Sequence, residues 1–290
     1  MLSIKNKRFN IPLFMVLPTI IFILAVSVYP LIYSFYMTLH DWSLTRAEPP
    51  TFVGIGNYIS LFQDNRFWYS FRTTVIFTGW VVGMEMVIGM ALALSITRNT
   101  RFQQICRSIL LIPMMITPVV LSLMWKYMYN PEYGIFNYFL HFLKIEGPIW
   151  LGEPAPALPA VIMVDIWQWT PFIFLLLFSG IASLPPEVFE AAQVDGASGF
   201  QTFRNITLPL SIPFLLVALL IRFMDSFRIF DTIYVLTKGG PANATETLSI
   251  YTYKVGFNYF NMGYAATLSY IILVIISFTS QQFVKLERKS

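Results

Sequence analysis

The sequence is poor in the residues from which metal and redox sites are built. It holds one cysteine, Cys106, and two histidines in 290 residues. A single cysteine excludes an internal disulfide, and so few thiol and imidazole groups leave no plausible metal cluster. No GxxxxGK[ST] loop is present, so the chain lacks the usual phosphate-binding loop of an ATPase. We therefore expect a chain that is not an enzyme and that binds no metal or cofactor itself.

Charge is also scarce. Only 12% of the residues are charged, against about 25% in an ordinary soluble domain. The net charge of +4 comes with no basic patch interleaved with aromatics, so we expect no nucleic-acid partner. What dominates instead is apolar: 56% of the residues are hydrophobic and the mean hydropathy is +0.64. These values predict an integral membrane protein in a lipid bilayer.

The apolar residues form long continuous runs. A helix needs roughly 20 apolar residues to cross a bilayer, whereas a membrane β-barrel shows alternation in segments of about 10. We therefore predict an all-α polytopic membrane protein, one domain over residues 1–290. Its six helices are expected at about 11–39, 71–97, 108–129, 158–182, 211–236 and 263–284. Pro113 and Pro118 should kink the third.

The first run could instead belong to a signal peptide, because Ala25-Val26-Ser27 weakly resembles a cleavage site. A signal peptide has an apolar region of only about 7–15 residues, and this run is far longer, so we interpret it as an uncleaved helix. Basic residues are more frequent in the segments on the amino-terminal side of the membrane and at both ends of the chain. The positive-inside rule then places both termini in the cytoplasm.

Residues 183–210 form a polar loop between the fourth and fifth helices. Pro185 and Pro186 indicate a helix start, and Asp195-Gly196 a stop, because glycine tolerates the left-handed conformation that ends helices. Ser198 can cap a second short helix, which we expect Pro209 to close. The loop is net acidic, which is unusual for a cytoplasmic segment. It is either a docking surface for a protein or an ordinary interfacial loop.

Polar side chains interrupt the fourth and fifth helices. Such residues usually face a bundle interior or a water-filled cavity. At spacings of i, i+3/i+4 and i+7 they share one face on each helix, which predicts a solute-binding surface made of Asp165, Gln168, Trp169 and Phe172 on one helix and Arg222, Asp225, Ser226 and Ile229 on the other.

Two structural interpretations of these charges stay open. Arg222 with Asp225, and Arg228 with Asp231, could be i, i+3 pairs that neutralise each other. Glu85, near the middle of the second helix, is expected to form a helix–helix hydrogen bond rather than contact a solute.

The polar loop carries the motif Glu190-Ala191-Ala192, three residues, Gly196, nine residues, Ile206, one residue, Leu208-Pro209. This spacing resembles the EAA motif of permease subunits of bacterial ABC importers. With Trp167–Phe172 before the loop and Thr237–Pro241 after it, most of the chain is similar to the branch that imports maltose, glycerol phosphate and oligosaccharides.

The resemblance implies a type I ABC importer permease fold in the bacterial cytoplasmic (inner) membrane. Its coupling helix would seat in an ATPase subunit through Glu190, Ala191, Ala192, Asp195 and Gly196. It further implies import of a carbohydrate, with room for an acidic one, by alternating access. The partners would be a second homologous permease, two ATPase subunits that bind ATP and Mg, and an external solute-binding protein.

Two other classes of function compete with this one. An ion-coupled secondary transporter would need its own coupling-ion site, and such folds commonly carry inverted repeats; neither is apparent. A non-transporting membrane sensor or scaffold is disfavoured by the charged helix faces.

Overall fold

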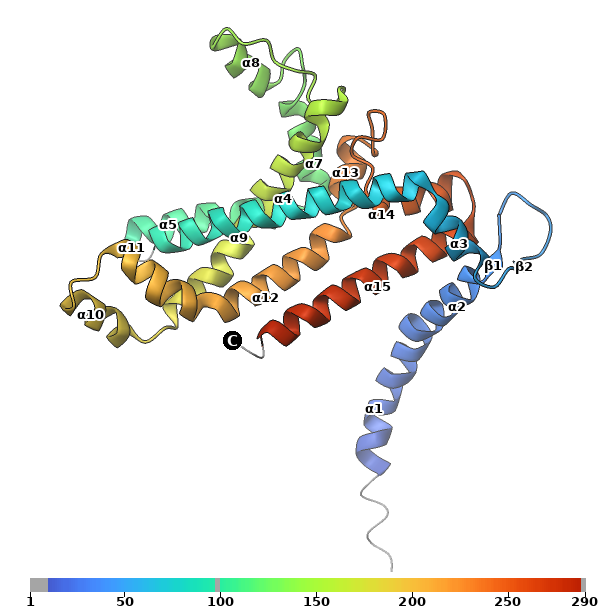
Figure 1. The fold of residues 1–290 in the computed structure, drawn as a ribbon, viewed down its shortest axis with the longest axis horizontal. Helices are drawn as coiled ribbons and strands as arrows, with labels where there is room; N and C mark the ends of the chain where they lie inside the picture. The colour runs from blue at the N-terminus through green and yellow to red at the C-terminus, as the bar shows by residue number, and fades with distance from the viewer. Residues whose placement is uncertain (1–9, 97–99, 288–290) are drawn as a thin grey trace, which may run out of the picture. The chain divides into compact units, whose positions relative to one another are not determined.

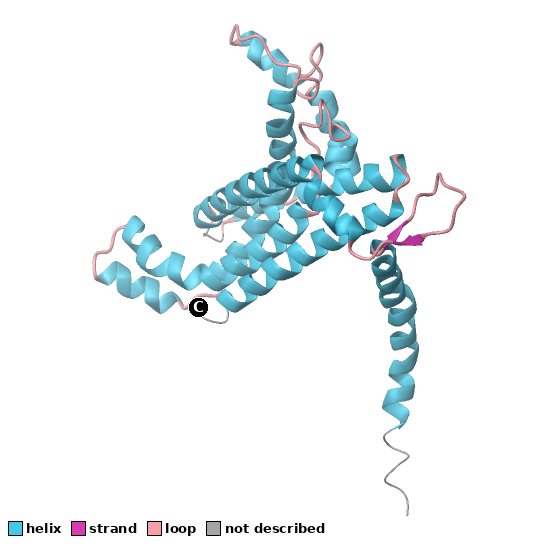
Figure 2. Ribbon diagram, turned by 45° about the vertical axis from the view of Figure 1, so that its right-hand side comes forward, coloured by secondary structure: helices cyan, strands magenta, loops and turns pink. Residues whose placement is uncertain are grey.

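The computed structural model describes residues 10–96 and 100–287, which are mostly helical with two short strands (Figures 1 and 2). These residues form two compact units. The first holds the described residues through Asp64 together with Thr252–Ile271, and the second holds Asn65–Tyr251 and the residues from Ile272 onward. The single-domain interpretation stays a prediction. The predicted end of the second helix at Thr97 lies outside the described residues, as do the terminal basic residues Lys5, Lys7, Arg8, Arg288 and Lys289.

The first unit begins with the first predicted membrane helix, nearly to its expected bounds. Three segments follow one another without a break: α1 (Asn10–Ile23), the π-helical η1 (Leu24–Val28) and α2 (Tyr29–Thr38). A two-stranded antiparallel pairing of β1 (His40–Asp41) with β2 (Thr51–Phe52) and the helix α3 (Gly56–Gln63) follow. Asn57 in α3 donates hydrogen bonds to the carbonyls of Thr38 and His40, at 2.8 and 2.9 Å, and so ties α3 to the end of α2.

The second unit is built around three long helices, α4 (Asn65–Ser95), α9 (Pro154–Ala182) and α12 (Leu208–Phe227). α4 and α9 approach closely at Gly89, where an added Cβ would lie 2.6 Å from a methyl carbon of Ile173. Small residues permit such contacts between membrane helices, where close packing replaces the hydrophobic effect.

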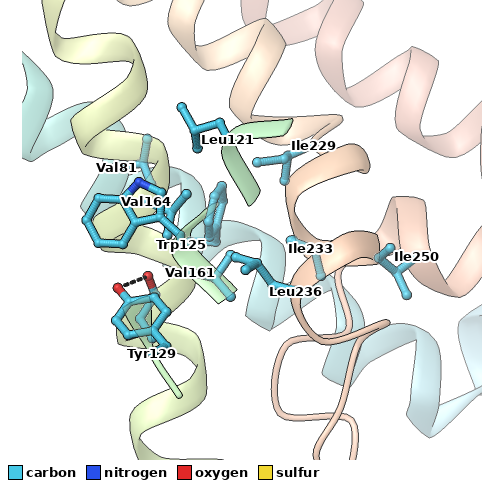
Figure 3. Close-up of a cluster of buried hydrophobic side chains, with 12 residues drawn as sticks. Val81, Leu121, Trp125, Tyr129, Val161, Val164, Ile229, Ile233, Leu236 and Ile250 are labelled. Atoms are coloured by element: carbon cyan, nitrogen blue, oxygen red, sulfur yellow. Dashed lines mark hydrogen bonds between the residues drawn. The ribbon is translucent and has the colours of Figure 1, made fainter. Parts of the chain in front are cut away.

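Figure 3 shows the larger core cluster of the second unit. Phe77 and Val81 of α4 meet Val161 and Val164 of α9 there, against residues of α7 and of the shorter helices on the carboxyl side of α12. Tyr129 is buried in it, and its hydroxyl donates a hydrogen bond to the Ala160 carbonyl at 3.0 Å. This cluster fixes the helix ends beside which the candidate site lies.

The third predicted helix, expected over 108–129 with a kink at Pro113 and Pro118, is broken at that place and begins earlier. It consists of α5 (Arg101–Leu110), α6 (Ile112–Met115) and α7 (Pro118–Met128), and the two halves are bent by 97°. The break falls between Pro113 and Pro118, the residues expected to kink it. Proline lacks the N–H needed to continue the backbone ladder, and two prolines so close together interrupt the helix rather than bend it. The short helix α8 (Ile135–Phe142) follows.

The fifth helix also differs from its predicted bounds of 211–236. Its helical path begins with α11 (Gly199–Thr202), continues through the π-helical η2 (Phe203–Thr207) into α12, and then breaks before α13 (Asp231–Leu236). Pro209 therefore does not close a second short helix, as expected, but lies in the first turn of α12. The missing proline N–H falls directly after the π-helical turn η2, where the regular i→i−4 bonding of the helix is already interrupted.

The chain ends with α14 (Leu248–Tyr253), η3 (Lys254–Asn258) and α15 (Met262–Glu287). Within the described residues, five helices are long and apolar enough to cross a membrane, or six if the bent pair of α5–α6 with α7 counts as one span. The all-α polytopic class predicted from the sequence is confirmed.

Candidate functional site

A buried ionic cluster joins the three long helices of the second unit. Arg222 of α12 donates to both carboxylate oxygens of Glu85 in α4, from Nε at 2.7 Å and from Nη2 at 2.9 Å. The same Nη2 donates to Asp165 of α9 at 2.6 Å. Arg222 and Asp165 are each 2% exposed and Glu85 is fully buried. Buried charges persist in apolar surroundings only when they are paired and hydrogen-bonded, as these three are.

Two members of this cluster, Arg222 and Asp165, line a cavity of about 300 Å³. Asp165 and Trp169 of α9 line it together with Arg222 and Asp225 of α12 and Pro118 at the start of α7. The remaining lining comes from the break after α12 and the start of α13, namely Arg228, Ile229, Phe230, Asp231 and Thr232. Asp225 and Arg228 pair at 2.6 Å, and their side chains are 37% and 63% exposed. A buried ionic wall and an exposed ionic pair therefore border one polar cavity.

The cavity combines aromatic rings with hydrogen-bonding groups. Trp169 is half-buried, and the guanidinium carbon of Arg222 lies 5.1 Å from the centroid of its ring, which holds that ring in place. Phe230 adds a second ring, and Thr232 a hydroxyl. Carboxylates accept strong hydrogen bonds from hydroxyl groups, and aromatic rings pack on apolar faces. The arrangement can therefore hold a polyhydroxylated solute.

Five of the eight predicted solute-binding residues line this cavity, and three do not. The amide nitrogen of Gln168 donates to the Ile116 carbonyl at 3.2 Å, where the third span is broken. The Ile116 carbonyl lies at the break between α6 and α7, outside the regular hydrogen bonding of either helix. The membrane interior offers no water as another donor to this oxygen. The Gln168 carbonyl oxygen is buried and has no hydrogen-bond partner among the described residues.

Phe172 and Ser226 are the other two predicted residues that do not line the cavity. Phe172 lies about 10 Å farther along α9 than Asp165, at 1.5 Å per residue, and packs against a second core cluster that includes Met90 and Phe174. Ser226 is buried, and its hydroxyl donates to the Phe223 carbonyl at 3.4 Å. Phe172 was expected to share one solute-binding face of α9 with Asp165 and Trp169. That expectation fails because the cavity does not extend far enough along α9 to reach Phe172.

Neither i, i+3 pairing considered from the sequence forms. Arg222 pairs with Glu85 and Asp165 rather than Asp225, and Asp225 pairs instead with Arg228. Asp231 lies beyond the helix break, where the i, i+3 geometry of a continuous helix no longer applies. The helix–helix hydrogen bond expected for Glu85 is confirmed.

Five lining residues were not among the predicted solute-binding residues: Pro118, Arg228, Phe230, Asp231 and Thr232. They enter the cavity only because the third and fifth helices break beside it. The prolines were a signal for the first break. For the second, the residues from Arg228 to Phe230 carry neither glycine nor proline, and no local signal marks it.

From Pro185 to the start of the second short helix at Ser198, the polar loop has the local structure expected from its sequence. The short helix α10 (Pro186–Val194) has Pro186 in its first turn and Asp195 as its C-cap. Gly196 has a φ of +73°, and the Ala197 N–H donates to the Ala192 carbonyl at 2.9 Å, which closes the helix end. Ser198 then caps α11, since its hydroxyl accepts from the Gln201 N–H and its own N–H donates to the Gln201 side chain.

α10 lies beyond the ends of α9 and α12 in Figure 1. Of the five predicted coupling residues, Glu190, Ala191, Asp195 and Gly196 are exposed, and Ala192 is buried. Two apolar side chains are exposed beside them, Val194 at 88% and Phe200 at 70%. Acidic and apolar groups side by side on a short rigid helix form a surface suited to docking a protein.

Comparison with known proteins agrees with the resemblance to transport permeases found in the sequence. Residues 85–287 match the family model described as binding-protein-dependent transport system inner membrane component. The chain is 38% identical to the trehalose/maltose transport system permease protein of Thermococcus litoralis, over 90% of this chain and 87% of that protein. It is 36% identical to the trehalose transport system permease protein of Mycobacterium tuberculosis, over 94% of this chain and 87% of that protein.

The fold is shared with a solved ABC importer. A bacterial ABC transporter involved in the import of the acidic polysaccharide alginate contains a chain that superposes with a TM-score of 0.84, covering 98% of this chain and 96% of that one at 23% identity. The protein therefore has the fold of an ABC importer permease, as its sequence predicts.

Proposed function

Because the chain belongs to the family of inner membrane components of binding-protein-dependent transport systems, we propose that it is the permease subunit of an ATP-driven importer that moves a carbohydrate. The observation that carries the proposal is the cavity bounded by Asp165, Trp169 and Arg222. It offers carboxylates, a hydroxyl and aromatic rings beside helices of membrane length. The trehalose and maltose systems named among its relatives support a sugar as the solute.

The exposed loop supplies the connection to an energy source. In this proposal α10 docks onto an ATPase subunit, and ATP and Mg bind there rather than to this chain. Among the described residues, no group of three His, Cys, Asp or Glu side chains is placed to hold a metal ion. Glu190 is exposed on α10, where its carboxylate can pair with a basic group of the partner.

The complete importer then holds two ATPase subunits, a second homologous permease and an external solute-binding protein. With α10 in the cytoplasm, the chain lies in a bacterial inner membrane with both termini inside. A complex of the alginate importer with a periplasmic protein that carries a pentasaccharide supports the delivery of solute by an external protein.

The geometry suggests how the chain takes part in alternating access. ATP shifts the population between two states by binding one of them better, and the coupling helix carries that bias to the helices it joins. Along the chain, α10 follows α9 and precedes α12, and an ion pair between Arg222 and Asp165 bridges those two helices. A displacement of α10 therefore acts on the two helices that carry this bridge and the Trp169 ring of the cavity.

The rival classes have less support. An ion-coupled transporter and a membrane sensor both need a chain that works without an ATPase, whereas family membership and the exposed α10 favour a chain that needs one. Co-purification separates these possibilities. A tagged form of the protein expressed in its own cells should bring down an ATPase, and vesicles that hold the complex should accumulate sugar only when ATP is supplied on the α10 side.

Glu190→Lys provides the specific test of the docking surface. Reversing the charge replaces attraction with repulsion, so the recovered ATPase should fall at least about tenfold, the effect of about 1.4 kcal/mol. Glu132→Lys, on an exposed loop before α8, is the matched control and should leave recovery unchanged. Full recovery and normal ATP-dependent uptake by Glu190→Lys would contradict a coupling role for α10.

A further inference from the structure

The cavity next to Trp169 has an uneven distribution of charge. Three carboxylates, those of Asp165, Asp225 and Asp231, line it with only two guanidinium groups, those of Arg222 and Arg228. Whether an acidic or a neutral solute fits depends on whether either guanidinium can still bind an anion.

Arg222 has little capacity left for an acidic solute. Three of its N–H···O contacts, at 2.6 to 2.9 Å, go to Glu85 and Asp165, and the side chain is 2% exposed. The two carboxylates outnumber its single charge, so the buried cluster is neutral when one carboxylate is ionised and negative when both are. A solute carboxylate would have to displace one of these oxygens and leave it buried without a partner.

Arg228 is matched as well, by Asp225 at 2.6 Å. That leaves Asp231, an exposed carboxylate in the first turn of α13 that forms no ion pair with any residue the structure describes. The Asp231 carboxylate can accept hydrogen bonds from hydroxyl groups but repels a uronate or a phosphate. The same is true of the free acceptor oxygens on the other two aspartates.

We propose that this cavity selects uncharged sugars and excludes uronic acids and phosphorylated sugars, with Asp231 as the residue that determines this specificity. The inference rests on the proposed function and narrows its substrate class. The sugar hydroxyls donate to the aspartates and to Thr232, while the rings of Trp169 and Phe230 contact the apolar faces of the sugar.

The test compares two ligands with the same ring skeleton but different charge, trehalose and the dicarboxylate made by oxidising both of its primary alcohols. Binding to the purified complex with its ATPases is followed by saturation-transfer NMR without the external binding protein, which could otherwise impose its own selectivity. Trehalose should bind at least about tenfold more tightly, the discrimination given by a repulsion of about 1.4 kcal/mol. The ratio of the two affinities should fall as salt is raised from 0.01 to 0.1 M, because the electrostatic screening length falls from about 30 to about 10 Å.

Asp231→Asn keeps the size of the side chain and removes its charge, so it should bring the affinities of the two ligands closer together. Glu132→Gln removes an exposed charge away from the cavity and should leave their ratio unchanged. Equal binding of the two ligands by the wild-type complex, or a ratio that Asp231→Asn does not change, overturns the specificity proposal.

A different result would contradict the proposed sugar-transport function itself. If the intact complex shows no saturable binding of trehalose, maltose or maltotriose, or if Trp169→Ala leaves that binding unaltered, the sugar site itself is wrong. The charge specificity then falls with it. Saturable binding that depends on Trp169 but shows no charge preference overturns only the specificity.

Discussion

Arg222 and Glu85 are joined by two parallel hydrogen bonds although 137 positions separate them in the chain. The pair connects α12 to α4, and the bond from Arg222 to Asp165 adds α9. The three longest helices of the second unit therefore meet at one guanidinium group, which also forms the wall of the proposed sugar cavity. Stability and solute binding should both depend on this group, and substitutions around it can separate the two.

Removing Glu85 should destabilise the protein strongly. Glu85→Ala leaves buried Arg222 with one partner where it had two, and breaking a buried pair costs about 3–5 kcal/mol. The exposed Asp225–Arg228 pair serves as the comparison, since Asp225→Ala should cost only about 0.2–1 kcal/mol. Thermal unfolding of the purified complex in one detergent measures both. Equal losses would mean that the buried cluster contributes nothing beyond an ordinary surface pair.

Replacing Trp169 should impair transport without loss of assembly. Trp169→Ala removes a ring that lines the cavity and should lower sugar uptake at least about tenfold, because an aromatic contact to a ligand is worth roughly 0.5–1.5 kcal/mol beyond the area it buries. Trp167 lies on the same helix but does not line this cavity, so Trp167→Ala is the matched control. Radiolabelled uptake and recovery of the ATPase are measured together. Unchanged uptake by Trp169→Ala would make its ring a packing residue.

Gly196 should be sensitive to substitution because of its backbone rather than its surroundings. Its φ is +73°, and no atom lies within 4 Å of the position a Cβ would take. Gly196→Ala therefore costs roughly 1 kcal/mol in backbone strain alone, and relief of that strain should misdirect α10 and lower ATP-dependent uptake.

The control for Gly196 is Gly199, which has the same open space but no positive φ. Gly199→Ala should be tolerated, and Gly196→Asn should restore part of the uptake because asparagine adopts the left-handed conformation more readily. The three variants are compared by uptake and by ATPase activity. Equal behaviour of the two alanine variants would exclude backbone strain as the cause.

The orientation in the membrane can be tested with introduced thiols. In a Cys106→Ser background, Ala47→Cys should react with an impermeant thiol reagent in intact cells. Val194→Cys, at a position 88% exposed on α10, should react only after the cells are permeabilised, because the charge distribution places α10 inside. Labelling of Val194→Cys in intact cells would reverse the orientation and place α10 beyond the reach of a cytoplasmic ATPase.

The sequence by itself determined the helical membrane architecture and the local structure of the polar loop as far as Ser198. Both depend on local properties: the length of an apolar run sets whether a helix can span a bilayer, and Gly196 and Ser198 set where short helices end and begin. The same locality explains why the prolines gave the position of the break in the third helix but not its angle of 97°.

Only the tertiary structure decided the partners of Arg222. From the sequence, Asp225 was the nearest candidate, because i, i+3 neighbours on one helix are the pairs that spacing reveals. A buried guanidinium group instead pairs with the carboxylates that can accept hydrogen bonds from its N–H groups, since a low-dielectric interior penalises any unpaired charge. Which carboxylates those are depends on how α4, α9 and α12 are rotated and staggered against one another, and that is fixed by the packing of side chains such as Ile173 against Gly89.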